Sequence, residues 1–166
     1  MRRREFITVL GGAVAWPFAA CAASINIVAL GASNTAGRGV GYQQAYPAQL
    51  QAMLRAKGLD VNVINAGVNG DTTEGMLGRL DSAAPAGTRL VLISPSANDA
   101  KHGMSAQQGS YVSSIVSRLH ARGIKTIIVP PLRTFTKQAD GEHLSASAHQ
   151  AVAAMLLPRV IAAIGK

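Results

Sequence analysis

The sequence has 166 residues, of which 48% are hydrophobic and 14% are charged, and its formal net charge is +8. This length favours one domain, and the apolar share excludes a disordered chain because it is large enough to form a core. Beyond residue 23 the basic residues form no run and are not interleaved with aromatic residues, so we expect no nucleic-acid partner.

The spacing of cysteine and histidine residues argues against a metal or redox site. Cys21 is the only cysteine, which excludes an internal disulfide, and neither a CxxC nor an HExxH motif occurs. The histidines lack the spacing of zinc ligands; they are His102, His120, His143 and His149. We therefore predict that the protein uses neither a metal nor an organic cofactor.

Residues 1–23 have the three-part layout of an export signal. A basic start is followed by an apolar stretch from Phe6 to Ala20 and then by small residues. The apolar stretch is shorter than the ~20 residues that a membrane span needs. The pair Arg3-Arg4 is typical of a twin-arginine signal, with an ordinary Sec signal as the alternative.

Cleavage of this signal is predicted after Ala23, which leaves a single domain over residues 24–166 in the periplasm or outside the cell. We expect this domain to have no stable membrane span. A second outcome is a lipid anchor on Cys21, since the residues before it resemble a lipobox. Phe18 disfavours that outcome because it is uncommon at the first position of such a box.

Apolar runs and helical patterns alternate along the rest of the chain. Strands are predicted at residues 25–30, 61–66, 90–94 and 125–129, and helices at 46–57, 71–80, 105–122 and 145–164. Asp71 and Glu74 have the spacing of a capping box at the start of the second helix. This alternation predicts an α/β fold, a three-layer α/β/α sandwich with a mostly parallel sheet.

Five candidate site residues follow the ends of the four predicted strands. Ser33 follows the first strand, Gly67 the second and Asn98 the third, while Asp140 and His143 lie in the loop after the fourth. Ligands of open parallel sheets bind at the carboxyl ends of the strands. We therefore expect these five residues to lie at one edge of the sheet.

These residue types fit nucleophilic catalysis. A serine hydroxyl needs a base, and His143 is the candidate. Asp140 lies three residues before it, a spacing that lets the carboxylate hold one ring nitrogen while the other faces Ser33. A tetrahedral oxyanion needs preorganised donors, which the backbone N–H groups of Ser33 and Gly67 and the side-chain amide of Asn98 can supply. Each residue alone is more typical of a turn or a helix flank, but their combination at one edge favours catalysis.

Four short blocks of the sequence resemble those of the SGNH (GDSL-type) hydrolase family, especially its exported thioesterase, lysophospholipase and arylesterase branch. The blocks are Leu30–Gly37, Asn65–Thr72, Ser96–Asp99 and Asp140–His143. The resemblance implies that Ser33 is the nucleophile, that Asp140 and His143 complete its triad, and that Gly67 and Asn98 belong to the oxyanion hole. It also implies a flavodoxin-like sheet.

Three departures from the family pattern matter for function. Ala32 replaces the usual Asp before the nucleophile, and Ser96 replaces the usual Gly of the third block, which would strain the loop if that position needs a positive φ. Only nine residues separate Pro130 from Asp140, where many relatives have another helix and strand. We therefore expect a four-stranded core with strand order 2-1-3-4.

The resulting hypothesis is a serine esterase that forms an acyl-enzyme on Ser33. Its substrates would be carboxylic esters or thioesters of short to medium acyl groups, either small molecules or lipid-derived. One alternative is an O-deacetylase that acts on carbohydrates. The other is a binding module that kept the fold and lost turnover, which the replacements at Ala32 and Ser96 would explain.

Overall fold

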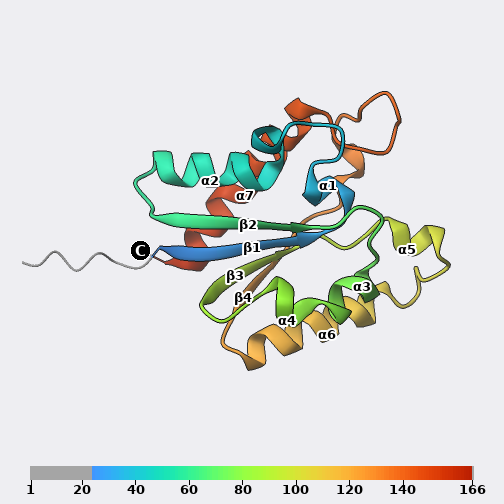
Figure 1. Cartoon of the computed structure of the whole chain (residues 1–166), viewed down its shortest axis with the longest axis horizontal. Helices are drawn as coiled ribbons and strands as arrows, with labels where there is room; N and C mark the ends of the chain where they lie inside the picture. Colours follow the sequence, from blue (N-terminus) through green and yellow to red (C-terminus); the bar gives the residue numbers. More distant parts are fainter. Residues whose placement is uncertain (1–23, 166) are drawn as a thin grey trace, which may run out of the picture.

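Four parallel strands form a single sheet of order β2-β1-β3-β4 in the computed structural model, which describes residues 24–165 (Figure 1). The strands are β1 (Ile25–Gly31), β2 (Val61–Gly67), β3 (Thr88–Ile93) and β4 (Lys125–Ile128). The predicted fold class, strand number and strand order are confirmed. The predicted export signal lies outside the described residues.

Helices cover both faces of the sheet, and two single-turn helices lie at one end of it (Figure 1). One face carries α2 (Tyr46–Ala56) and α7 (Ala146–Ile164). The other carries α3 (Thr73–Gly78), α4 (Leu80–Ala83) and α6 (Gln108–Ala121). The single turns are α1 (Ser33–Ala36) and α5 (Asn98–Lys101), and two short 3₁₀ helices are η1 (Tyr42–Gln44) and η2 (Leu132–Thr134).

The alternation of side chains along β1 divides the core into two layers. Ile27 and Ala29 pack with the buried residues of α2 and α7, whereas Val28 and Leu30 pack with those of α3, α4 and α6. Successive side chains of a strand point to opposite faces, so a strand covered on both sides reads as one continuous apolar run. This is why the apolar runs of the sequence identified the strands.

Two glycines let the carboxyl ends of β1 and β2 approach the first helical turn. Gly31 of β1 pairs in register with Gly67 of β2. A Cβ at Gly67 would lie 2.1 Å from the backbone nitrogen of Ala36, so no other residue fits there without moving α1. The sheet and the turn that carries Ser33 are therefore in direct backbone contact.

The region after β2 differs from the sequence-based expectation. The capping box predicted for Asp71 and Glu74 is wrong, since the residue that caps α3 is Thr72, whose hydroxyl accepts the N–H of Gly75 at 3.0 Å. Asp71 instead turns its carboxylate toward Arg79. The helix expected over residues 71–80 is divided at Arg79 into α3 and α4.

Other element boundaries shift by a few residues. Helix α6 begins at Gln108 rather than at Ser105, because residues 104–107 form a turn that precedes it. The short helices α1 and α5 were not predicted, since four residues are too few to show a period. They matter for function because Ser33 and Asn98 are their first residues.

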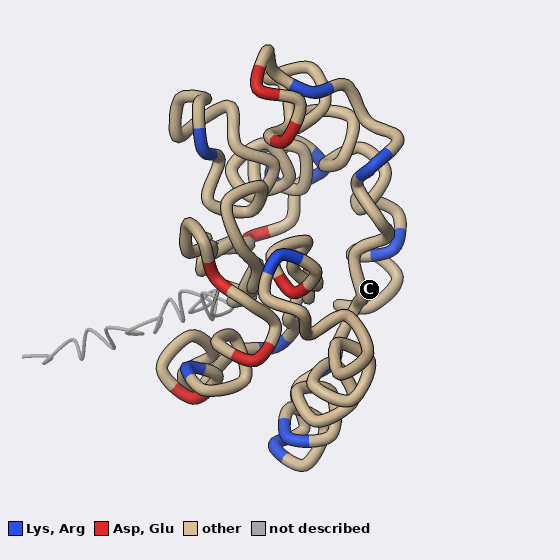
Figure 2. The backbone as a smooth tube through the Cα atoms, turned by 90° about the vertical axis from the view of Figure 1, so that its right-hand side faces the viewer, with Lys and Arg blue, Asp and Glu red and all other residues tan. Residues whose placement is uncertain are grey.

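Helix α7 is capped as predicted by Ser145, whose hydroxyl accepts the N–H of Ala148, and it continues through Pro158 to Ile164. Its length and composition would also allow it to cross a membrane. Its buried residues, however, pack in the core against α2 and the sheet. The charged residues of the described part are spread over many segments of the backbone, as Figure 2 shows.

A buried histidine links α2 to α7. His149 of α7 is fully buried, and its Nδ1 accepts the backbone N–H of Tyr46 at 3.2 Å, so that Nε2 carries the proton. The two rings stack, and the hydroxyl of Tyr46 is 3.1 Å from Oγ1 of Thr35 in α1. Burial lowers the pKa of His149 to about 4, since a charged imidazolium would lose its hydration there.

This contact predicts that the protein loses stability in mild acid. In the unfolded chain His149 binds a proton near its ordinary pKa of 6.5, whereas in the folded chain it does so only near pH 4. The contribution of neutral His149 to the stability of the fold is therefore complete above pH 6.5 and is lost as the pH falls toward 4. We expect the free energy of unfolding to fall by about 2 kcal/mol between pH 7 and pH 4.5 because of this residue. Urea denaturation at both pH values measures it.

In the variant His149→Gln the free energy of unfolding should fall less between pH 7 and pH 4.5. The glutamine amide keeps an acceptor for the N–H of Tyr46 and does not titrate. His102→Gln is the matched control, since His102 is exposed. An equal decrease in the free energy of unfolding in the wild type and in His149→Gln would contradict the role of His149 in this pH dependence.

Candidate active site

Ser33 lies at the point where the central strand meets the first helical turn. Strand β1 ends at Gly31, and Ser33 is the first residue of α1. Its Oγ is 3.0 Å from Nε2 of His143, which is 110 residues away in the sequence. The structure thus brings together a hydroxyl and the imidazole that the sequence singled out as its base.

Asp140 orients this imidazole from the other side. Nδ1 of His143 lies 2.6 Å from Oδ2 of Asp140, and Oδ1 of the same carboxylate accepts the backbone N–H groups of Glu142 and His143, each at 2.9 Å. These hydrogen bonds, first the backbone and side-chain bonds from His143, hold the pKa of Asp140 well below its usual range. The carboxylate therefore stays ionised and fixes the proton on Nδ1, which leaves Nε2 as an acceptor facing Ser33.

The loop that carries His143 is tied to the nucleophile turn by side-chain amides. Oδ1 of Asn34 accepts the backbone N–H of Leu144 at 2.8 Å. Nε2 of Gln138 donates to the carbonyls of Arg38 and Leu144, both at 2.8 Å. Sequence reasoning missed both residues, because nothing in their local pattern indicates a partner 100 or more residues away.

The two other candidate donors already have partners within the protein. The N–H of Gly67 donates to Oδ1 of Asn65 at 3.0 Å, and Nδ2 of Asn98 donates to the carbonyl of Asp71 at 2.8 Å. An amide nitrogen of Asn carries two hydrogens, so Asn98 keeps one for a ligand. The N–H of Gly67 can donate to an oxyanion in two ways. It can form a bifurcated hydrogen bond that Asn65 still shares, or the side chain of Asn65 can rotate away and release it.

Ser96 does not strain the loop, contrary to the concern raised by its replacement of Gly. No residue other than glycine has a positive φ within residues 24–165. The Ser96 hydroxyl instead donates to the carbonyl of Asp71 at 2.7 Å and accepts the N–H of Asn98 at 3.0 Å. A residue that looked like a defect thus holds the segment from which Asn98 projects.

Asp99 has a structural role that its sequence context did not indicate. It is fully buried, and its carboxylate accepts both the N–H and the hydroxyl of Thr73, at 2.8 and 2.5 Å, and the amide of Gln108 at 2.7 Å. A buried charge is tolerated when it is this fully hydrogen-bonded. Asp99 therefore fixes α5 against α3 and α6.

An ion pair joins the loops on the two sides of the site. Nζ of Lys101, in α5, lies 2.8 Å from Oε1 of Glu142, which is next to His143. Both side chains are 56% exposed, so this pair contributes little to stability. It nevertheless shows that the segments carrying Asn98 and His143 approach each other.

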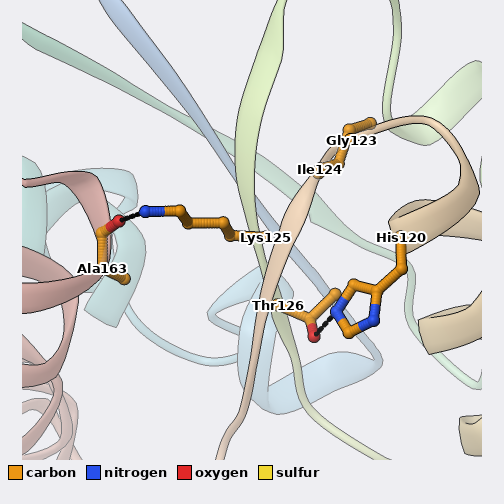
Figure 3. Close-up of a pocket in the computed structure, with 6 residues that line it drawn as sticks. All are labelled: His120, Gly123, Ile124, Lys125, Thr126 and Ala163. Carbon is orange, nitrogen blue, oxygen red and sulfur yellow. Dashed lines mark hydrogen bonds between the residues drawn. The ribbon is translucent and has the colours of Figure 1, made fainter.

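A surface depression lies away from these residues. It is lined by His120, Gly123, Ile124, Lys125, Thr126 and Ala163 (Figure 3). Its β4 residues belong to the amino end of that strand, whereas Ser33 lies beyond the carboxyl end of β1. In Figure 3 the imidazole of His120 is hydrogen-bonded to Thr126 and the amine of Lys125 to the carbonyl of Ala163, so these groups are already paired.

No group of three or more His, Cys, Asp or Glu residues within residues 24–165 is arranged to hold a metal ion. The polar groups around Ser33 are instead arranged as a linear relay, hydroxyl to imidazole to carboxylate. Such a relay increases the nucleophilicity of a serine oxygen by accepting its proton.

Comparisons with known proteins identify the family of this chain. Residues 29–160 match the model of the GDSL-like lipase/acylhydrolase family. The chain is 34% identical to esterase TesA of Pseudomonas aeruginosa over 110 residues, which is 65% of this chain and 55% of that protein. It is 34% identical to an arylesterase of Vibrio mimicus over 119 residues, 68% of this chain and 60% of that protein. The matched parts thus span less than two thirds of either relative.

A crystal structure of TesA superimposes with a TM-score of 0.74 and 25% identity, covering 81% of this chain and 97% of that one.

Proposed function

Because the chain belongs to the GDSL-like lipase/acylhydrolase family, we propose that it is a serine esterase that forms an acyl-enzyme on Ser33. The observation that carries the proposal is the continuous relay from Oγ of Ser33 through His143 to Asp140, at 3.0 and 2.6 Å. The names of its relatives, an esterase and an arylesterase, support the same reaction class.

In the proposed mechanism, Oγ of Ser33 attacks the carbonyl carbon of the ester while Nε2 of His143 takes the hydroxyl proton. The carbonyl oxygen becomes an oxyanion, which the N–H groups of Ser33 and Gly67 and the amide of Asn98 stabilise. His143 then gives its proton to the leaving alcohol as the ester bond breaks. A water attacks the acyl-enzyme in the same way and releases the acid, while Asp140 stabilises the imidazolium in both steps.

This mechanism is tested with an active-site probe. A fluorophosphonate should label the wild type, and Ser33→Ala should abolish the labelling because it removes the attacking oxygen. Ser33→Ala and His143→Ala should each lower kcat for p-nitrophenyl acetate by about 10⁴-fold or more, since the relay acts as a unit. Asp140→Asn should cost less, because the imidazole is then only poorly oriented.

Ser113→Ala is the matched control, because its exposed hydroxyl only donates to the carbonyl of Gly109 within α6. Two outcomes count against the mechanism. Esterase activity retained in Ser33→Ala would overturn it, and a wild type without labelling or turnover would favour the binding module instead.

We further propose that the acyl pocket is shallow and takes short to medium acyl groups. The segment between β4 and Asp140 contains only the single turn η2, and its apolar residues Leu132 and Phe135 pack against the core. Nζ of Lys137 donates to the carbonyl of Leu132, which holds the segment down. The apolar surface left for an acyl chain includes Val68, 45% exposed and directly after Gly67.

A series of p-nitrophenyl esters from acetate to palmitate, assayed below micelle-forming concentrations, tests the size of this pocket. We expect kcat/KM to peak at a short or medium chain, because each CH₂ that stays in water forgoes about 0.8 kcal/mol of transfer free energy. Val68→Ala should lower kcat/KM for medium chains more than for acetate. Ile128→Ala, which removes another exposed apolar side chain, is the control and should leave the profile unchanged.

A maximum at palmitate would contradict the shallow pocket. A profile restricted to acetate would favour the alternative of a carbohydrate O-deacetylase, and acetylated xylan fragments would then be the next substrates to assay. Thioesters and lipid-derived esters of matched acyl length extend the same test to other leaving groups.

Finally, we propose that the domain acts after export, in the periplasm or outside the cell. The support is the layout of residues 1–23, with Arg3-Arg4 before an apolar stretch. Replacing Arg3 and Arg4 together by Lys should abolish periplasmic delivery, measured by immunoblotting of cell fractions, whereas Arg2→Lys should not.

Undiminished periplasmic delivery of the double Lys variant would indicate the Sec route, and wild-type protein that stays unprocessed in the cytoplasm would contradict export. Palmitate labelling lost in Cys21→Ser would replace cleavage after Ala23 by a lipid anchor.

A further inference from the structure

The three candidate oxyanion donors come from three separate segments, and one side chain connects these segments. Ser33 follows β1, Gly67 ends β2 and Asn98 begins α5. Arg79, between α3 and α4, contacts the backbone before the first two donors and is paired with the residue that holds the third. Its side chain is 24% exposed, so the guanidinium is largely enclosed.

The contacts of Arg79 reach the carboxyl ends of β1 and β2. Its Nη2 donates to the carbonyl of Gly31 at 3.1 Å and to the carbonyl of Ala66 at 2.9 Å. The carbonyl of Ala66 and the N–H of Gly67 belong to one planar trans peptide unit, so fixing the oxygen also fixes the direction of the N–H. Gly31 precedes Ala32, which gives the start of α1 no side-chain hydrogen bond, so Arg79 braces this turn from outside.

The remaining contacts of Arg79 lead to Asn98. Its Nε donates to Oδ2 of Asp71 at 2.8 Å, and the side chain of Asp71 is only 11% exposed. The backbone carbonyl of Asp71 accepts Nδ2 of Asn98 and the hydroxyl of Ser96, at 2.8 and 2.7 Å. Asp71 is therefore held through its side chain and in turn orients the amide of Asn98 through its backbone.

We propose that Arg79 and Asp71 form a positioning pair that sets the geometry of the oxyanion hole. The inference rests on the proposed esterase function, and it assigns to the pair an effect on the transition state rather than on substrate binding. The planar guanidinium is suited to this task, because it directs several N–H groups to acceptors in one fixed arrangement. A lysine ammonium in its place reaches fewer of these acceptors.

The test compares Arg79→Lys and Arg79→Gln with the wild type. Arg79→Gln should lower kcat by about 10- to 100-fold with KM changed by less than about threefold, which is somewhat less than the loss of a complete oxyanion donor. Arg79→Lys should recover only a small part of the loss. Affinity for a trifluoromethyl ketone, which forms a tetrahedral oxyanion on Ser33, should fall in parallel with kcat/KM.

Arg118→Gln is the matched control, because Arg118 makes a similar 2.8 Å pair with Asp81 on the exposed side of α6. It should leave kcat and the inhibitor affinity unchanged. If Arg79→Gln does not fold, Asp71→Asn replaces it, since this change removes the charge and keeps the backbone carbonyl that Asn98 contacts. Thermal unfolding of each variant establishes that the fold is retained.

Unchanged kcat in folded Arg79→Gln or Asp71→Asn would overturn the positioning role, as would a loss confined to KM. The variant Ser33→Ala distinguishes failure of the esterase proposal from failure of the positioning pair alone. If that variant keeps its activity, the mechanism is wrong, whereas an inactive Ser33→Ala beside a fully active Arg79→Gln rejects only the positioning pair.

Discussion

The parallel, in-register pairing of β1 with β2 is the constraint on which the site depends. It places Gly31 opposite Gly67, and the lack of a side chain at Gly67 lets the backbone of α1 pack directly on the end of β2. Parallel strands direct all their carboxyl ends to one edge, so the loops after β1, β2, β3 and β4 meet there. A serine, two groups of oxyanion donors and a histidine can converge only because the sheet has this polarity.

Long-range hydrogen bonds then convert this convergence into a defined geometry. Asn34 next to the nucleophile holds the backbone after His143, and Asp140 is held by the backbone of its own loop. Three carboxylate hydrogen bonds keep Asp140 ionised, which fixes the tautomer of His143. The geometry is thus supported by groups that do not themselves touch a substrate.

The departures from the family pattern are compensated within the same network. Ala32 provides no side-chain hydrogen bond to the nucleophile turn, and Arg79 contacts that turn at the carbonyl of Gly31. Ser96 replaces a glycine without needing a positive φ, and its hydroxyl links Asp71 to Asn98. The short segment after β4 leaves that strand at the edge of the sheet, and it also leaves little material for a deep acyl pocket.

The sequence by itself determined the four strands and the helices α2 and α7, because buried strands leave apolar runs and amphipathic helices leave periodic patterns. The expected strand order came from the resemblance to the hydrolase family. The five candidate residues followed from the chemistry of their groups and from their positions after the strands. The sequence did not determine the single turns that begin at Ser33 and Asn98, which are too short to show a period. It also misplaced the cap of α3, which is Thr72 rather than its neighbour Asp71. The contacts among Asp71, Arg79, Ser96 and the end of β1 join residues 8 to 48 positions apart. Only the tertiary structure decided these contacts, because a hydrogen bond between distant segments depends on where the sheet places them and leaves no trace in the local sequence.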